Sequence, residues 1–135
     1  MVEKVATYGV RKTIMIGQES FYIALPAQVT NTGIEADSNG KKILRAGTPL
    51  YGDITKRDTA FVKATTTSGD AGAKSSNAVA VLLHDVDVTN GANNGNIVLA
   101  GCIDLLKLDT ATKALIDDAT KTALRNIIFV EGSSI

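Results

Sequence analysis

The stretch Ala78-Val79-Ala80-Val81-Leu82-Leu83 is the most continuous apolar run of the chain and decides its fold. A polar, glycine-containing segment precedes it, and the polar pair His84-Asp85 follows it. A short apolar run that is bounded by loop signals on both sides is typical of a fully buried strand. We therefore predict that residues 78–83 form the central buried strand of a sheet.

A second buried strand is predicted at Ile97–Leu105. A turn rich in Asn and Gly, residues 89–96, separates it from the alternating residues Val86 and Val88. Gly101 lies inside the second run, where a glycine can bend or bulge a strand. The two buried strands together predict a β-hairpin or a meander pair.

N-terminal to this pair, Asn39-Gly40 lies between the short runs Ile34–Ala36 and Lys42–Leu44. An Asn-Gly pair between two such runs is a strong hairpin signal, because both residues tolerate the positive φ that a tight turn requires. We therefore predict a hairpin over residues 34–44.

Three connecting pieces are predicted between this hairpin and the central strand. Pro49 favours an extended residue before it and has glycines nearby, so residues 46–53 are expected to form a fixed crossover. The run Phe61–Ala64 predicts a short strand. Residues 65–76 are polar and contain glycine, which is typical of a surface loop that is often mobile.

The C-terminal part has a different periodicity. Residues 109–115 predict a short helical turn, and Asp117 is a favourable N-cap for a helix over residues 118–125 with Asn126 as its C-cap. Ile127–Val130 then predicts a last strand that rejoins the sheet. The predicted fold class is mainly β with one or two short helices, a small α+β domain.

The composition excludes several classes of protein. The chain has 135 residues, 44% of them hydrophobic, and its 14 basic and 14 acidic side chains cancel, which suits one small domain. Balanced charge without Lys and Arg clusters argues against a nucleic-acid partner. No run is long enough to span a membrane, and no signal peptide is predicted. Cys102 is the only cysteine, so no disulfide framework is expected and synthesis in a reducing cytoplasm is predicted.

Candidate catalytic and metal-binding residues are few. His84 is the only histidine and is better interpreted as a strand-end residue in a structural hydrogen bond than as a general base. Cys102 lies in an apolar run and is expected to be buried and inert. Residues 85–91 lack the Gly and Glu that a calcium loop needs at its sixth and twelfth positions, and Asp117-Asp118 suit a helix N-terminus. We therefore predict no enzyme activity, no cofactor and no metal site.

Residues 1–30 differ from the rest of the chain. They contain two strand-prone runs, Thr13–Ile16 and Phe21–Leu25, without a convincing local partner. A lone strand is not stable unpaired, so the segment is expected to pack on its own domain or to add a strand to an open sheet edge of another chain. We accordingly divide the chain into an N-terminal arm, residues 1–30, and a single β-rich domain, residues 31–135.

Three segments in this order resemble the head decoration proteins of tailed phages of the lambda type: AGTPLYGD at 46–53, AVAVLLHDVD at 78–87 and DATKTALRNIIFV at 118–130. Those proteins share an Ala-x-Thr-Pro-Leu segment after an N-terminal arm, an apolar run in mid-chain, and a closing helix followed by a short strand. The resemblance covers about residues 34–131 and rests on the joint order of the segments. A longer N-terminal region and the added Asn39-Gly40 hairpin depart from the lambda pattern.

The resemblance implies a structural role without catalysis. Proteins of this type bind as trimers to the outside of the expanded capsid and cement its subunits against the pressure of the packaged DNA. For this chain it implies a homotrimer, the phage major capsid protein as partner, synthesis in the cytoplasm of the host bacterium and a place on the outer surface of the virion. The residues expected to contact the capsid come from the arm and from the Thr-Pro segment: Tyr8, Val10, Thr13, Ile14, Ile16, Phe21, Ile23, Thr48 and Pro49.

Two alternatives stay open from the sequence. One is a phage head-fibre protein, which would share the virion surface but not the cementing role. The other is a free-standing β-type module that binds carbohydrate or protein, which would need exposed aromatic side chains in a groove. Only Tyr8, Tyr22 and Tyr51 could supply them.

Overall fold

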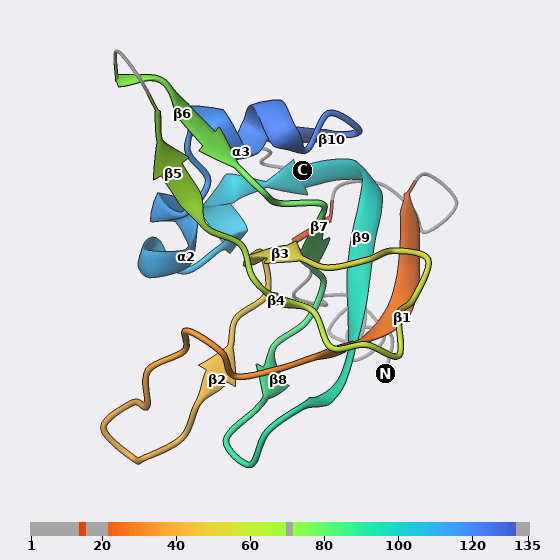
Figure 1. The fold of residues 1–135 in the computed structure, drawn as a ribbon. Coiled ribbons are helices and arrows are strands. Elements are labelled where there is room, and N and C mark those ends of the chain that lie inside the picture. Colours follow the sequence, from red (N-terminus) through yellow and green to blue (C-terminus); the bar gives the residue numbers. More distant parts are fainter. Residues whose placement is uncertain (1–13, 16–21, 70–71, 132–135) are drawn as a thin grey trace, which may run out of the picture.

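The computed structural model describes residues 14–15, 22–69 and 72–131, and the fold is given for these residues. In chain order the elements are β1 (Ile23–Val29), β2 (Ile43–Leu44), β3 (Pro49–Tyr51), β4 (Val62–Lys63), β5 (Thr66–Ser68), β6 (Lys74–Ser76), β7 (Ala80–Leu82), β8 (Val86–Asp87), β9 (Asn93–Asp104), the 3-10 helix η3 (Leu105–Lys107), α2 (Thr110–Ala114), α3 (Asp118–Ala123) and β10 (Ile127–Val130) (Figure 1). The chain is mainly β with two short α-helices, which confirms the predicted α+β class.

Five strands of a six-stranded sheet form a path that closes on itself, and the sixth strand, β10, pairs in parallel with the end of β9. Their order is β1-β9-β7-β3-β4, with each strand antiparallel to its neighbour. Val29 of β1 forms a parallel bridge with Phe61, next to β4. The Phe61 amide donates to the Gln28 carbonyl at 2.7 Å, and the Thr30 amide donates to the Phe61 carbonyl at 3.0 Å. The first and last strands are thereby joined into a small barrel, and closure of this kind leaves few strand edges open.

One apolar core fills the inside of this barrel. Phe61 lies at its centre, fully buried, and its ring packs so closely on Gly52 that a Cβ there would come within 2.7 Å of the ring. The short β2–β8 pair contributes Leu44 and Val86 to the same core. The buried residues of this core are Ala27, Val29, Leu44, Leu50, Phe61, Ala80, Leu82, Val86, Val88 and Ile97.

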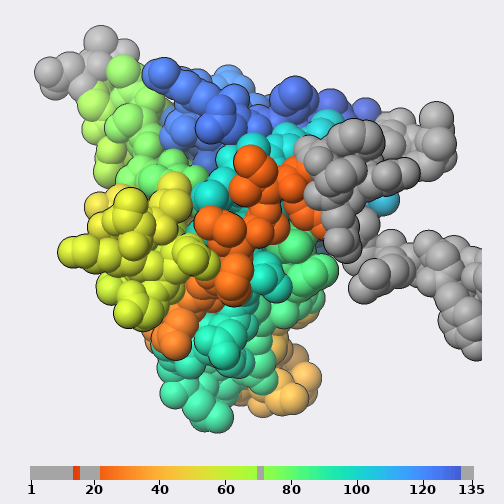
Figure 2. Space-filling view, turned by 90° about the vertical axis from the view of Figure 1, so that its right-hand side faces the viewer, coloured from red at the N-terminus to blue at the C-terminus, as the bar shows by residue number. Residues whose placement is uncertain are grey.

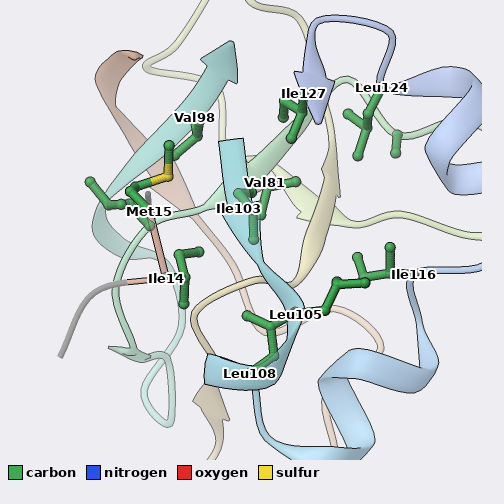
Figure 3. Packing of buried hydrophobic residues seen from close by; sticks show 12 residues of the cluster. Ile14, Met15, Val81, Val98, Ile103, Leu105, Leu108, Ile116, Leu124 and Ile127 are labelled. Atoms are coloured by element: carbon green, nitrogen blue, oxygen red, sulfur yellow. The ribbon is translucent and has the colours of Figure 1, made fainter. Parts of the chain in front are cut away.

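A second core lies on the other face of β7 and β9 (Figure 3). Val81 and Val98 point into it, while their neighbours Leu82 and Ile97 point into the barrel, as strand alternation requires. Its covering residues come from both ends of the chain: Ile14, Met15, Leu108, Ile116, Leu124 and Ile127. Because β7 is buried on both faces, its sequence is apolar without alternation, and the prediction of a central buried strand is confirmed.

Local capping residues fix the two α-helices. The Asp109 carboxylate accepts a hydrogen bond from the Thr112 amide at 2.7 Å, and the Asp117 carboxylate accepts one from the Thr120 amide at 2.8 Å. The predicted N-cap Asp117 is therefore confirmed, and Asp109 caps α2 in the same way. The predicted C-cap is wrong: α3 ends at Ala123 and its C-cap is the buried Leu124, not Asn126, because the backbone leaves the helical conformation at Leu124.

The N-cap of α3 gives a testable pH dependence. The backbone hydrogen bond from Thr120 is the largest cause that lowers the pKa of Asp117. We expect Asp117→Ala to lower the free energy of unfolding by about 1 kcal/mol at neutral pH. Asp117→Asn is expected to retain most of this N-cap contribution, because its amide oxygen can still accept the hydrogen bond. Because the folded-state pKa is depressed, the charge-dependent part of this contribution is present above the unfolded-state pKa and is lost as pH falls through the folded-state value.

Urea denaturation of the wild type and both variants at neutral and at acidic pH measures this contribution. A difference between Asp117→Ala and wild type that stays constant down to pH values below both pKa values would contradict the role of the charged cap.

The predicted hairpin at residues 34–44 is right in its turn and wrong in its pairing. The Asp37 carboxylate accepts hydrogen bonds from the amides of Asn39 at 2.8 Å and Lys41 at 3.0 Å, and Gly40 has a φ of 76°. Residues 34–36 form no strand, and β2 pairs with β8 instead. The side chain of Asp37 stabilises the turn locally, so no cross-strand pairing is needed to hold it.

Two predicted connections are strands. Pro49–Tyr51 is β3, between β7 and β4, and not a crossover. Pro49 is tolerated there because it is the first strand residue, and its carbonyl accepts from the Ala64 amide at 2.9 Å. Residues 66–68 and 74–76 pair as the exposed polar hairpin β5–β6, where a surface loop was predicted.

Candidate interaction surface

Part of the segment that the sequence left without a local partner belongs to the barrel. β1 pairs with β9 along its whole length, from Ile23 opposite Ala100 to Val29 opposite Asn93. Farther towards the N-terminus, the Ile14 carbonyl accepts from the Asp104 amide at 2.8 Å. Of the two alternatives for the run at 21–25, packing on its own domain is therefore the one that its described residues show. The partner was missed because it lies far away in the sequence.

The outer edge of β1 is protected against further strand pairing. Pro26 has no amide to donate, and its carbonyl accepts from the Arg57 guanidinium at 2.7 Å. The Gln28 amide donates to the Arg57 carbonyl at 3.2 Å. Figure 2 shows the connection that contains Arg57, in yellow, lying against β1, in orange. A proline and a covering loop are two of the ways in which proteins block an edge strand.

Four large apolar side chains are exposed in the described part of the chain: Ile23 at 56%, Tyr51 at 47%, Leu106 at 58% and Ile128 at 63%. Two of them flank β9. Ile23 of β1 is paired with Ala100, and Ile128 of β10 is paired with Cys102. Given the spacing of neighbouring strands and the two-residue offset along β9, the two isoleucines lie roughly 12 Å apart across the sheet. We call Ile23, Ala100, Cys102 and Ile128 the β9 strip.

The members of the β9 strip face away from the second core. A Cβ on Gly101 would meet Tyr22 and Met15, which belong to that core, so Gly101 faces inward. Its neighbours Ala100 and Cys102 therefore face outward. On β10, Ile127 packs into the core, and Ile128 points the other way. Contiguous exposed apolar side chains on a sheet are typical of an interaction surface.

The residues predicted to contact a capsid fall into three groups. Ile23 is exposed and belongs to the β9 strip. Ile14, Thr48 and Pro49 are buried, so on the surface of this chain they are not accessible to a partner. The others lie outside the described residues: Tyr8, Val10, Thr13, Ile16 and Phe21.

The exposure of Ile128 was not predicted from the sequence, although its place in an apolar strand at the end of the chain gives a signal for it. The last strand, Ile127-Ile128-Phe129-Val130, was interpreted as a uniform apolar run. In the structure Ile127 is buried and Phe129 packs against the second core, whereas Ile128 between them is exposed. An apolar edge strand beside a helix has one covered face, so half of its side chains are expected to point outward.

His84, Asp85 and Asp87 were the candidate catalytic or metal-binding residues. His84 is exposed and makes no hydrogen bond within the described residues, so the predicted structural hydrogen bond is wrong. The Asp85 carboxylate accepts from the Ala46 amide at 2.7 Å and from Arg45 at 3.2 Å, which holds the turn before β3. Asp87 accepts from the Thr89 hydroxyl at 2.6 Å, the largest cause that lowers the pKa of Asp87.

Cys102 is half-buried in the β9 strip, whereas the sequence predicted a fully buried side chain. Within residues 14–15, 22–69 and 72–131, no group of three or more His, Cys, Asp or Glu could hold a metal ion. Every buried side-chain nitrogen or oxygen in the same part of the chain has a hydrogen-bond partner.

A groove between β6 and α3 carries both signs of charge. Lys74 and Arg125 line it together with Asp117 and Asp118. Opposite charges at such short range offset one another, so this groove has no strong preference for an anionic or a cationic ligand.

Comparison with known proteins gives no relative: no protein-family model matches the chain, and no curated protein sequence matches it. Among the described helices, none has the length and apolar character needed to cross a membrane.

Proposed function

We propose that this protein is a head decoration protein of a tailed phage, which binds the outside of the expanded capsid as a homotrimer and stabilises it. The proposal rests on the resemblance of residues 46–53, 78–87 and 118–130 to that family. The β9 strip is the structural observation that carries it. In this proposal the partner is the phage major capsid protein, and the protein is located on the outer surface of the virion.

The position of the β9 strip suits this role. Ile23 follows directly on Tyr22, where the N-terminal part of the chain joins the barrel. Residues before Ile14 would leave the domain beside the same end of β9, because Met15 forms a bridge with Ile103, the neighbour of Cys102. Burial of an exposed Ile side chain contributes about 1.5–3 kcal/mol, so two of them supply a useful part of the binding energy.

A rigid barrel is also suited to a cementing protein. The closure between β1 and Phe61 and the protected β1 edge leave few backbone groups of β1 free for unwanted pairing, even at the high local concentration of a capsid surface. A net charge of zero means that binding would depend on shape and apolar contact more than on long-range attraction, and would weaken only modestly as salt rises.

Light scattering of the purified full chain, alone and with expanded empty capsids of its phage, tests the proposal. We expect a trimer, and saturation of the capsids at three copies per binding site. A chain that stays monomeric at high concentration and does not bind capsids would contradict it and would favour a free-standing binding module. Binding as projecting fibres at low copy number would favour a head-fibre protein.

The alternative of a carbohydrate-binding groove has little support from the aromatic side chains. Tyr51 is exposed on β3, whereas Tyr22 packs against the second core. Within the described residues, these two tyrosines therefore do not form an exposed aromatic pair of the kind that stacks on sugar rings.

A further inference from the structure

The chain contains three Asn-Gly pairs, Asn39-Gly40, Asn90-Gly91 and Asn94-Gly95, in three different settings. Asn-Gly is the dipeptide best suited to spontaneous deamidation, because glycine has no Cβ to hinder attack by its own amide nitrogen. All three asparagines are exposed, so exposure does not distinguish them. The conformation and packing of the backbone around each asparagine distinguish the three sites.

Two of the pairs lie in open turns. Gly40 and Gly91 have φ values of 76° and 119°, and a Cβ on either would meet nothing within 4 Å. One turn hydrogen bond holds each glycine amide: Gly40 to the Asp37 carbonyl at 3.0 Å, and Gly91 to the Val88 carbonyl at 3.1 Å. Exposed turns of this kind open locally at a small cost in free energy.

The third pair lies inside the longest strand. Asn94 and Gly95 of β9 are paired with Gln28 and Ala27 of β1. A Cβ on Gly95 would lie 3.1 Å from Val86 and 3.3 Å from Leu82, so the backbone is packed against the inner core. The backbone rotation that brings the Gly95 nitrogen to the Asn94 side chain would require β1 and β9 to separate.

We propose that Asn39 and Asn90 are sites of spontaneous deamidation in the folded protein and that Asn94 is protected. The glycine amide nitrogen attacks the side-chain carbonyl carbon of the preceding asparagine, a carbon–nitrogen bond forms, and ammonia leaves. Water then opens the cyclic imide to aspartate or isoaspartate. One water is consumed and one ammonia released at each site, and no oxidant or reductant is needed.

The two reactive turns lie at the same end of the molecule. One turn leads into β2 and the other follows β8, and these strands pair with each other at the bottom of the view in Figure 1. The Lys42 amide donates to the Thr89 hydroxyl at 2.9 Å, which ties the two connections together. Both new carboxylates would be ionised at neutral pH, so this end gains two negative charges in a chain whose net charge is zero.

Ageing of the full-length protein in mildly alkaline buffer tests the inference, independently of any capsid. The same incubation in denaturant supplies the control, because unfolding removes the structural differences among the three sites. Peptide mass spectrometry with fragmentation between residues 90 and 94 measures each rate. We expect Asn39 and Asn90 to deamidate in the native protein at rates within about tenfold of their rates in the denatured protein. Asn94 is expected to deamidate in the native protein at least about a hundredfold more slowly than in the denatured protein.

Charge variants on isoelectric focusing provide a second readout. Asn39→Gln and Asn90→Gln are each expected to remove one acidic step that appears on ageing, whereas Asn94→Gln removes none. Deamidation of Asn94 at its denatured rate in the native protein would overturn the inference. Protection of Asn39 or Asn90 to the level of Asn94 would overturn it for that residue.

Discussion

Deletion of residues 1–17 is expected to unfold the domain or to destabilise it by several kcal/mol, whereas deletion of residues 1–13 leaves it folded. The difference lies in Ile14 and Met15, which are only 4% and 3% exposed in the second core (Figure 3). Truncation of a buried Ile or Met costs about 2–5 kcal/mol. A domain of this size is stable by only about 5–15 kcal/mol, so the loss of both is a large fraction of the total.

Urea denaturation followed by circular dichroism measures both deletions. The point variants Ile14→Ala and Met15→Ala separate the lost core packing from the mere shortening of the chain. If the 1–17 deletion keeps the unfolding midpoint of the full chain, then the packing of these two residues does not stabilise the domain. Under the proposed function, the folded 1–13 deletion is also the correct reagent to test whether the arm contributes to capsid affinity.

Replacement of both exposed isoleucines of the β9 strip is expected to weaken capsid binding by about 20–400-fold. Burial of a fully exposed Ile contributes about 1.5–3 kcal/mol, and each 1.4 kcal/mol corresponds to a tenfold change in affinity. Ile23 and Ile128 are 56% and 63% exposed, so each contributes only that share. Ile23→Ser and Ile128→Ser, singly and together, are to be compared with wild type by co-sedimentation with expanded capsids. Because both side chains are already exposed, the free energy of unfolding is expected to change by no more than about 0.5 kcal/mol for each.

Tyr51→Ser and Leu106→Ser are the matched controls. Both positions are exposed and apolar, and neither belongs to the strip. We expect the two control variants to bind capsids as tightly as wild type. Equal losses in strip and control variants would mean that general surface hydrophobicity drives binding. Undiminished binding by the double variant would mean that the strip is not the capsid-contacting surface.

Local signals in the sequence predicted the elements that depend on local contacts. Asp109 and Asp117 cap helices that begin within one residue of the predicted positions, because an N-cap bonds to an amide three residues ahead. The apolar run at 78–83 predicted β7 correctly. This strand is covered by a core on each face, so none of its side chains faces solvent and its sequence contains no polar residue.

Long-range pairing explains most of what the sequence did not reveal. The Asn39-Gly40 turn is present, but Ile43 and Leu44 pair with β8 instead of closing a local hairpin. β9 begins at Asn93, inside the predicted turn, because its first residues pair with Gln28 and Val29. Asparagine and glycine predict a turn when read locally, and only the distant partner strand makes them extended.

The candidate surface was predicted only in part, because its make-up also depends on long-range strand pairing. Ile23 was named because its run is apolar, and it is exposed. Thr48 and Pro49 were named from the resemblance, and they are buried because β3 lies inside the sheet. Ile128 could not be placed on a surface until the pairing of β10 with β9 was known.

The pairing of β1 with β9 also determines when the sheet can form during synthesis of the chain. Val29 pairs with Asn93, so about 64 residues must leave the ribosome after β1 before its partner exists. At typical elongation rates of about 5–20 residues per second, β1 waits for several seconds without its strand partner. Contacts of such high sequence separation are intrinsically slow to form. The nascent chain therefore carries the apolar residues of β1 without their strand partner until β9 has emerged, so the sheet cannot be completed before that point of synthesis.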